Sequence, residues 1–330
     1  MKKALLKTIY QVGGFAPFHW ANRNKVLILT YHRFSREKEN NKVSESQFSS
    51  HLEYLKKHNR VLSLTEVTES LKNEKPLPPN ATVITIDDGY NDAYEIAFPL
   101  LKDFNFPATL FAVTDFLDGK CWLWPDQMRY VLQNTKSDLA KIEFSDNDKI
   151  EAPLVNADQI KKLEFADRIN SRLKKMPNEQ KDSKIKEISS ALNVAIPTLP
   201  TQDYAPVTWP QAREMDADNL KIGSHTATHP ILTKINQRDL EIELQTSKQR
   251  LENVLGKKNV HFCYPNGTFN KTVQHSVEDA GYKSAVTTDY GFNKLQCDWF
   301  SLNRIDAQPA IENFAQSVSG FEVLKQKIGR

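Results

Sequence analysis

Short apolar segments of strand length alternate with helical patterns along most of this 330-residue chain. Residues 26–31 and 83–86 are continuous, largely apolar runs, which is typical of strands that are covered on both faces. Further strands are expected at 108–113, 220–223, 261–264, 284–287 and 301–305. Helical patterns such as 239–255 and 272–280 lie between them. This alternation predicts an α/β fold with parallel strands and helices outside them, either a barrel or an open sheet.

Local signals mark where some of these helices begin and bend. Ser44-Glu-Ser-Gln47 has the pattern of a capping box, and apolar residues follow it at helical spacing. Residues 93–104 also carry apolar residues at helical spacing. Pro99 falls inside this segment and predicts a bend, because proline lacks the N–H that continues the helix.

Composition and charge exclude several classes of protein. The 44 basic and 41 acidic side chains nearly balance, so we expect no nucleic-acid partner, whose binders usually carry a clustered basic excess. No uncharged apolar run reaches the roughly 18 residues that a membrane span requires. The three cysteines are odd in number and widely spaced, which fits neither a disulfide framework nor a zinc finger. Reduced cysteines are typical of a cytoplasmic protein.

The pattern changes between residues 120 and 204, where lysine-rich helical segments dominate and strand signals are few. We interpret 120–204 as a helical insertion into one barrel or sheet domain formed by 24–119 and 205–312. Residues 313–330 are expected to form a helical C-terminal tail.

The N-terminal segment 1–23 is interpreted as a short amphipathic helix, with Leu5, Ile9 and Val12 on one face and Gly13 at its end. Its polar residues and the lack of a small-residue cleavage site argue against a signal peptide. Such a helix packs on the domain or lies on a membrane surface as a peripheral contact. We therefore expect a cytoplasmic or membrane-associated protein and leave secretion open.

Polar clusters follow three of the expected strands. They are Thr85-Ile-Asp-Asp-Gly89, Ser224-His-Thr-Ala-Thr-His-Pro230 and Tyr264-Pro-Asn-Gly267. Each cluster alone is typical of a turn. Because the carboxyl ends of parallel strands meet at one end of an α/β fold, the three together indicate a functional site.

Asp88, His225 and His229 form a plausible metal-binding set. Two imidazoles and one carboxylate leave coordination positions open for water and substrate, as a catalytic zinc-type site needs. Asp87 is adjacent in sequence, and we expect it to stay off the metal and take a proton from water.

These three segments resemble the ordered motifs of the polysaccharide deacetylases, carbohydrate esterase family 4. The resemblance extends over most of 26–305 apart from the insertion. It implies a distorted (β/α) barrel and a metal-dependent hydrolase that removes N-acetyl groups from sugars, cleaving a linear amide. By position, Asp87 matches the catalytic base of the family, and Asp88, His225 and His229 match its metal ligands. Zn²⁺ is the expected ion, with Co²⁺, Ni²⁺ or Mn²⁺ as alternatives.

The sequence also departs from the family pattern. Cys263 and Tyr264 precede Pro265 where the family usually carries an arginine, which resembles the branch that deacetylates exopolysaccharides or other cell-surface glycans. The late Leu-x-His motif, which supplies a general acid, is replaced by Leu302-Asn-Arg-Ile305. In that branch an early histidine takes this role, and His32 resembles it; a buried structural histidine is the alternative.

The resulting hypothesis assigns a role to each group. Asp87 removes a proton from water, the metal and the Tyr264 backbone N–H stabilise the oxyanion, and His32 protonates the departing amine. Substrate contacts are expected from residues of the third cluster and from two tryptophans, which otherwise serve as core aromatics. The candidates are Tyr264, Pro265, Asn266, Trp209 and Trp299.

Two other functions remain open. One is a deacylase or deformylase acting on a lipid-linked sugar at the cytoplasmic face of a membrane. The other is an inactive, carbohydrate-binding relative, suggested by the missing arginine and histidine. A glycosidase with Asp87 and Asp88 as its carboxylate pair is disfavoured, because such pairs normally flank the scissile bond from several ångströms apart.

Overall fold

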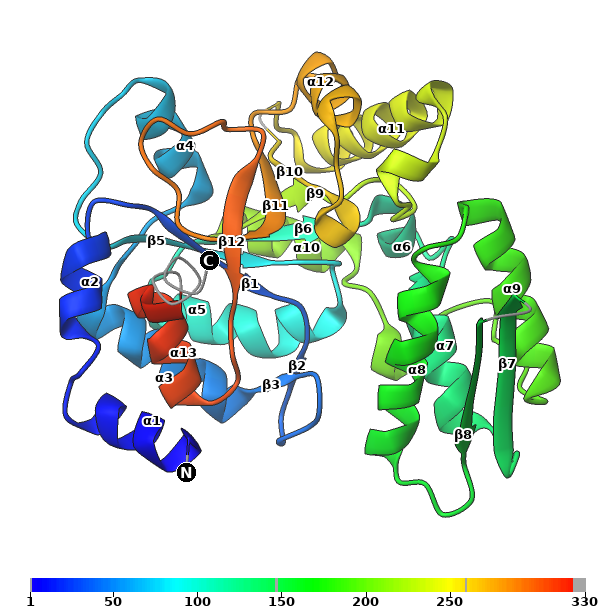
Figure 1. Cartoon of the computed structure of the whole chain (residues 1–330). Coiled ribbons are helices and arrows are strands. Elements are labelled where there is room, and N and C mark those ends of the chain that lie inside the picture. The colour runs from blue at the N-terminus through cyan, green and yellow to red at the C-terminus, as the bar shows by residue number, and fades with distance from the viewer. Residues whose placement is uncertain (1, 146–147, 259, 323–330) are drawn as a thin grey trace.

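A closed barrel of parallel strands forms the centre of the computed structural model, which describes residues 2–145, 148–258 and 260–322 (Figure 1). Seven strands make up the barrel, in the order β1 (Leu27–Tyr31), β12 (Leu302–Asp306), β11 (Ala285–Tyr290), β10 (Phe262–Cys263), β9 (Leu220–Ser224), β6 (Ala108–Ala112) and β5 (Ala81–Ile86). The pairing of β5 with β1 closes the ring. A short strand, β4 (Arg60–Val61), adds to β5 outside it. The predicted barrel is confirmed, and the open sheet is excluded.

The strands are buried on both faces, which explains their continuous apolar runs. All residues of β1, β5 and β6 are buried. One set of alternate residues packs together in a single cluster, which includes Ile28, Val83, Phe111, Val286 and Leu302. The residues between them belong to a larger cluster shared with the helices, which includes Leu29, Ile84, Leu110 and Ile305. Period-two alternation therefore exists, but both sets are apolar.

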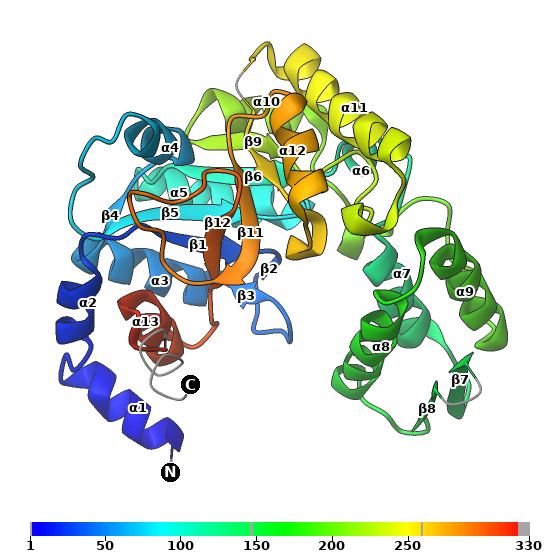
Figure 2. The ribbon, with the colours of Figure 1, turned by 45° about the horizontal axis from the view of Figure 1, so that its top comes forward.

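Helices surround the barrel (Figure 2). They include α3 (Glu45–His58), α4 (Leu64–Lys72), α5 (Phe98–Asp103), α6 (Thr114–Leu117), α10 (Trp209–Ala217), α11 (Gln237–Leu255), α12 (Lys271–Asp279) and α13 (Ile311–Ser319). The predicted capping box begins α3, where the Ser44 hydroxyl accepts from the Gln47 N–H. Near Pro99 the chain forms a π-helical turn, Ala93–Ala97, before α5 begins. The irregularity expected there is thus a widened turn next to the proline.

The segment between residues 120 and 204 has a hydrophobic core of its own. It contains α7 (Trp124–Asn134), β7 (Leu139–Ser145), β8 (Asp148–Pro153), α8 (Gln159–Leu173) and α9 (Asn178–Ala191). The antiparallel β7–β8 hairpin differs from the all-helical expectation. Its alternation places Ala140 and Ile142 inside and charged residues outside, and those lysines and glutamates also suit a helix. The exact domain boundaries stay a prediction.

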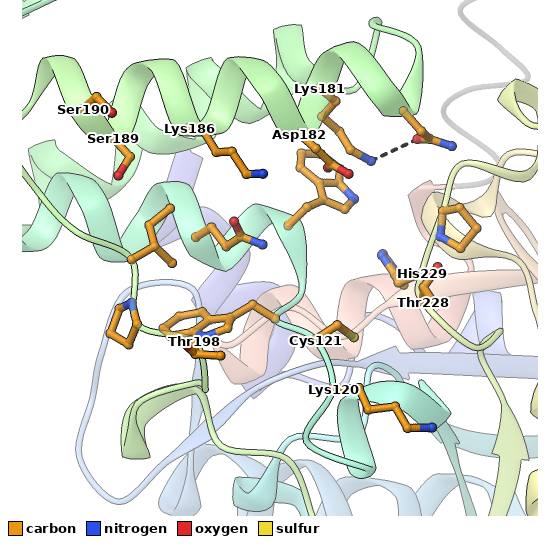
Figure 3. Close-up of a pocket in the computed structure, with 17 residues that line it drawn as sticks. Lys120, Cys121, Lys181, Asp182, Lys186, Ser189, Ser190, Thr198, Thr228 and His229 are labelled. Atoms are coloured by element: carbon orange, nitrogen blue, oxygen red, sulfur yellow. Dashed lines mark hydrogen bonds between the residues drawn. The ribbon is translucent and has the colours of Figure 1, made fainter.

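A cavity of about 600 Å³ lies between this segment and the barrel (Figure 3). Residues of α7 and α9 line one side, and Thr228, His229 and Pro230 line the other. The insertion therefore shares a cavity with the loop that carries a predicted metal ligand.

The N-terminal segment forms two helices, α1 (Lys2–Gln11) and α2 (Ala16–Asn22). Ile9 packs against the core cluster of the barrel, whereas Leu5, Val12 and Trp20 are exposed. The segment thus packs on the domain with part of its apolar surface left open. Among the described residues, no helix has the length and apolar character that crossing a membrane requires. Of the predicted C-terminal tail, residues 323–330 lie outside the described residues.

Candidate metal and catalytic site

The three predicted clusters converge at the carboxyl end of the barrel, around a cavity of about 580 Å³. The loops after β1, β5, β9 and β10 all contribute to its lining. Among the lining residues are His32, Asp87, Asp88, His225, His229, Tyr264 and Asn266. Parallel strands account for this convergence, because all their carboxyl ends point the same way.

Asp88, His225 and His229 bring three potential ligand atoms together. Asp88 Oδ1 lies 3.5 Å from His225 Nε2 and 3.6 Å from His229 Nε2. Ligands bound tetrahedrally about 2.1 Å from one zinc ion lie roughly 3.4 Å apart, so these spacings fit a shared ion. Burial, together with the neighbouring His225, lowers the pKa of His229 to about 3, which keeps this imidazole neutral at pH 7.

The hydrogen bonding of His225 also favours a cation between these groups. Its Nδ1 lies 2.8 Å from the Cys263 carbonyl oxygen, which can only accept, so Nδ1 carries the proton. In the neutral imidazole, Nε2 then presents a lone pair towards the Asp88 carboxylate. Burial alone would lower the pKa of His225, but the neighbouring Cys263 and Asp88 raise it well above its usual value, so a proton joins the two groups when no metal is bound. A divalent ion takes the place of that proton. The residues present therefore fit a divalent metal.

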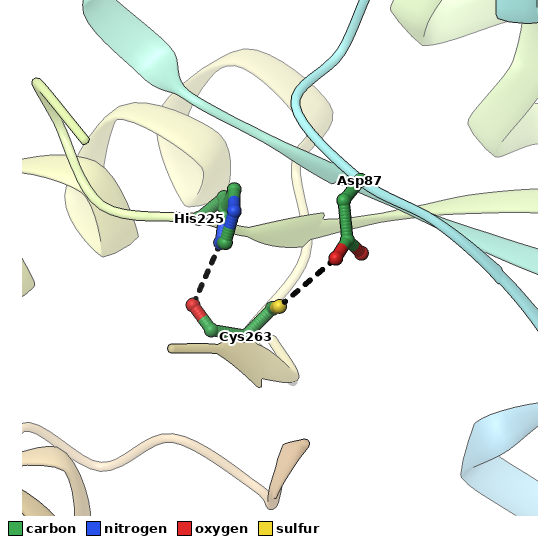
Figure 4. Close-up of side chains that lie close together, drawn as sticks. All are labelled: Asp87, His225 and Cys263. Carbon is green, nitrogen blue, oxygen red and sulfur yellow. Dashed lines mark hydrogen bonds between the residues drawn. The ribbon is translucent and has the colours of Figure 1, made fainter. Parts of the chain in front are cut away.

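A second group of potential ligands shares His225 with the first. It consists of Asp87, His225 and Cys263, which Figure 4 shows. The Cys263 thiol contacts Asp87 Oδ2 at 3.6 Å. However, the Arg304 guanidinium already contacts both Asp87 oxygens and the Cys263 sulfur. A fixed cation excludes a second one at this position, so this group is not a metal site.

Asp87 and Arg304 form a buried ion pair inside the barrel, at the carboxyl end of its strands. Both Asp87 oxygens accept from guanidinium nitrogens at 2.7 Å, and both side chains are almost fully buried. Burial alone would raise the pKa of the Asp87 carboxyl, but Arg304 and its hydrogen bonds hold that pKa below its usual value. Asp87 is therefore an ionised carboxylate at neutral pH.

His32 follows β1 and lies beside this carboxylate. Its Nε2 is 3.7 Å from Asp87 Oδ2, and its side chain is 49% exposed. The half-exposed ring lines the cavity, so it differs from the buried structural histidine considered as the alternative. An imidazole placed here can exchange protons with a bound molecule.

Strained backbone conformations gather in these loops. Asp88, Thr226, His229 and Asn266 all have positive φ, although none is glycine. Such conformations cost of order 1–3 kcal/mol each and persist only where the surroundings enforce them. In the loop after β9, Glu243 of α11 helps to enforce these conformations, because its carboxylate accepts from the N–H groups of residues 227 and 228.

The loop after β10, which carries Tyr264, Pro265 and Asn266, offers fewer groups for contact with a substrate than expected. The Tyr264 N–H donates to the Val286 carbonyl at 3.2 Å, so it is not free to stabilise an oxyanion, which corrects that expectation. The Tyr264 hydroxyl donates to the Phe300 carbonyl. Pro265 is buried and has no N–H. By contrast, Asn266 Nδ2 is buried without a hydrogen-bond partner among the described residues, and Asn266 lines the cavity.

The two tryptophans do not lie where we expected them. The Trp209 indole donates to Asp118 at 2.7 Å and stacks under Arg250, away from the cavity lining. The Trp299 carbonyl accepts from Ala285, the first residue of β11, so Trp299 lies at the amino end of the barrel. A position at the opposite end of the strands is incompatible with stacking on a substrate in this cavity.

Two functional residues were missed by the sequence reasoning. Arg304 stands inside a predicted buried strand, and a charged residue there needs a carboxylate partner, which was the available signal. Glu243 left no comparable signal, because a glutamate in a helix is usually a solvated residue.

Comparisons with known proteins agree with this geometry. The sequence pattern of the family described as "Polysaccharide deacetylase" matches residues 74–141 and 176–285, more than half of the chain. The Bacillus subtilis (strain 168) protein "Putative polysaccharide deacetylase YxkH" is 20% identical over 292 residues, 88% of this chain and 74% of that protein. The "Poly-beta-1,6-N-acetyl-D-glucosamine N-deacetylase" of Staphylococcus aureus (strain N315) is 37% identical over 107 residues, only 28% of this chain and 37% of that enzyme.

Solved structures share the fold at low sequence identity. The deacetylase PplD of Streptococcus pyogenes, in complex with acetate, aligns with a TM-score of 0.60 at 20% identity, over 90% of this chain and 99% of that one. IcaB from Ammonifex degensii aligns with a TM-score of 0.56 at 17% identity, over 89% of this chain and 97% of that one. His32 and Arg304 lie outside the residues matched by the family pattern, so their placement rests on the geometry of this chain.

We expect Asp88→Ala and His229→Ala to abolish metal binding, because each removes one of three ligands. Elemental analysis of the purified variants should find close to no metal, against roughly one ion per wild-type chain. His275→Ala, which changes an exposed histidine of α12, is the control and should keep its metal. Full metal content in either ligand variant would remove that residue from the coordination set.

We expect Arg304→Met to lower the free energy of unfolding by about 3–5 kcal/mol at neutral pH, because it leaves a buried carboxylate unpaired. In the wild type, the lowered Asp87 pKa stabilises the fold at neutral pH, and this contribution disappears only as pH falls below about 4. In the variant that pKa rises, so ionisation of Asp87 destabilises the fold as pH increases. The difference in the free energy of unfolding between the wild type and Arg304→Met should therefore narrow as pH is lowered towards 4.

Denaturant unfolding of the metal-free proteins across this pH range measures the difference. Arg36→Met breaks an exposed ion pair with Glu45 and should cost under about 1 kcal/mol. If Arg304→Met lowered the free energy of unfolding as little as Arg36→Met does, or by the same amount at every pH, Arg304 would not be the residue that stabilises the ionised Asp87.

Proposed function

Because this chain belongs to the polysaccharide deacetylase family, we propose that it is a metal-dependent hydrolase that removes N-acetyl groups from amino sugars of a polysaccharide or glycan. Membership makes it a carbohydrate N-deacetylase; the metal, the residue roles and the substrate are the parts that we propose. The observation that best supports these proposals is the convergence of Asp88, His225 and His229 beside the ionised Asp87 in one open cavity.

The metal would be held by Asp88 Oδ1 and the Nε2 atoms of His225 and His229. Two imidazoles and one carboxylate suit Zn²⁺, and Co²⁺, Ni²⁺ or Mn²⁺ suit the same donors. When bound, such an ion supplies Lewis acidity, which polarises a carbonyl oxygen and makes water more acidic.

Asp87 acts as the general base. Arg304 keeps it ionised, and its Oδ2 lies on the side of His32 and the cavity. It takes a proton from the attacking water, whose oxygen then bonds to the acetamide carbonyl carbon. The ion pair also fixes the direction of the carboxylate, because two parallel hydrogen bonds leave it little rotational freedom.

His32 acts as the general acid. An amine leaves an amide poorly unless its nitrogen is protonated, and His32 Nε2 lies within reach of a group bound next to Asp87. The half-exposed position lets the ring regain a proton from solvent after each turnover. Asn266 lines the cavity, and its Nδ2, which has no partner in the described part of the chain, suits a hydrogen bond to an oxygen of the sugar.

An N-acetylated exopolysaccharide is the substrate best supported. The Staphylococcus aureus relatives are named for poly-beta-1,6-N-acetyl-D-glucosamine, and the alignment with them covers 28% of this chain. A lipid-linked sugar at a membrane is a second candidate, favoured by the exposed Leu5, Val12 and Trp20 of the N-terminal helices. Assays with both substrates, measuring the acid released from each, distinguish the two.

We expect acetate release from N-acetylglucosamine oligomers that stops when a chelator removes the metal. Asp87→Asn should keep its metal but lose roughly two or more orders of magnitude in kcat, because it removes the base without removing a ligand. Asp279→Asn, at an exposed position, is the control. No acetate release from any N-acetylated glycan by the metal-loaded enzyme would contradict the proposal and favour an inactive, carbohydrate-binding relative.

His32→Ala should act selectively on substrates with poor leaving groups. We expect roughly a hundredfold loss of kcat on an N-acetylated oligosaccharide but little loss on 4-nitrophenyl acetate, because nitrophenolate leaves without protonation. Steady-state kinetics on both substrates provide the measurement. Equal losses on the two substrates, or normal rates on the amide, would rule out His32 as the acid.

A further inference from the structure

A second cavity lies on the far side of His229 from the reaction site. It holds about 600 Å³ and is bounded by α7, α9 and the loop of Thr228, His229 and Pro230 (Figure 3). His229 lines both cavities. A group bound in the second cavity would therefore lie next to the residue being deacetylated.

A buried lysine without a carboxylate in contact is its most unusual feature. Lys181 of α9 is only 3% exposed. Among the residues that the structure describes, Asp182 acts on its charge, but no carboxylate forms an ion pair with its Nζ. Its Nζ donates to Asn178 Oδ1 at 3.0 Å and lies 4.6 Å from the centre of the Trp124 ring. A buried ammonium normally has an anion beside it. Burial accordingly lowers the pKa of Lys181 to about 8.

Unpartnered hydrogen-bond donors also gather on the walls of this cavity. Trp122 Nε1, Trp124 Nε1, Asn178 Nδ2 and His229 Nδ1 are all buried and have no partner among the described residues. Indole and amide nitrogens only donate, and His229 Nδ1 donates when its Nε2 acts as a ligand. Buried polar atoms rarely stay unsatisfied in a folded protein. Three lysines and one carboxylate, that of the exposed Asp182, line the cavity, so it combines a net positive charge with unpartnered donors.

We propose that this cavity binds an oxyanion, either a phosphate or a carboxylate, carried by the glycan next to the sugar that is deacetylated. The proposal rests on the proposed function and names the class of its substrate. An oxyanion would supply the negative charge that Lys181 lacks and the acceptors that the surrounding N–H donors lack. The exposed Lys186, which also lines the cavity, adds positive charge.

Kinetics on matched oligosaccharides test the proposal. N-acetylglucosamine oligomers with a neutral neighbour are compared with oligomers whose neighbour carries a phosphate or a uronic acid carboxylate. We expect the wild-type kcat/KM to be about tenfold higher for one anionic oligomer, the scale of one charge-assisted hydrogen bond. Lys181→Met should reduce this ratio to about one. Lys184→Met, on the same helix but outside the cavity lining, should keep the wild-type ratio.

Direct binding separates this proposal from the proposed function. Calorimetry on the full chain, treated with chelator, uses inorganic phosphate, glucuronate and neutral glucose as probes. The wild type should bind phosphate or glucuronate, and the anion that binds identifies the substituent. Lys181→Met and Trp124→Phe should each weaken that binding by about tenfold or more. Trp124→Phe replaces the indole by a smaller aromatic ring without an N–H donor and keeps Lys181, so it remains informative if Lys181→Met does not fold.

The outcomes are distinct. Acetate release without any anion preference, or a preference that survives Lys181→Met, overturns the anion site and leaves the deacetylase intact. Binding of an anion that depends on Lys181, without acetate release from any glycan, supports the anion site and contradicts the proposed function. A wild type that binds neither anion overturns the anion site regardless of activity.

Discussion

Closure of the barrel between β1 and β5 is the constraint on which the site depends. The two strands pair in parallel register from Leu27 with Thr82 to Tyr31 with Ile86, and the Asp87 N–H then donates to the Tyr31 carbonyl. This register places the residues that follow each strand side by side. His32 therefore meets Asp87, although 54 residues separate them in the chain. An open sheet would leave them on opposite edges.

The same closed ring brings a positive charge into an otherwise apolar interior. β12 pairs with β1 on its other side, so Arg304 reaches across to Asp87 and Thr85 of β5. Removing two charges from water is costly, and only their close pairing offsets that cost. The pair keeps a carboxylate ionised at the point where a base is needed. Arg304 supplies this guanidinium from β12 and also contacts the Cys263 sulfur of β10.

The insertion adds a second set of chemical groups to this frame. It has its own core and an exposed outer surface, but its inner side faces the loop of His229 across a cavity. Lys181 lies buried there without an ion-pair partner, and the indole N–H groups of Trp122 and Trp124 lack an acceptor, among the residues that the structure describes. A segment of this kind can change which glycan is accepted without altering the barrel, because its residues line both cavities, with Leu123, Pro125 and Arg129 at the reaction site.

The sequence by itself determined the positions of the barrel strands along the chain, the three polar clusters and the candidate residues Asp87, Asp88, His225 and His229, because these follow from local patterns and motif spacing. The sequence could not reveal which distant residues meet. The contact of Arg304 with Asp87 and the hydrogen bond of the Tyr264 N–H depend on the pairing of strands from distant segments. The contact of Glu243 depends on how α11 packs beside the loop after β9. Trp299 illustrates the same limit, since only the direction of β11 and β12 decides at which end of the barrel it lies. Local patterns encode elements, whereas pairing and burial between them decide the chemistry of the site.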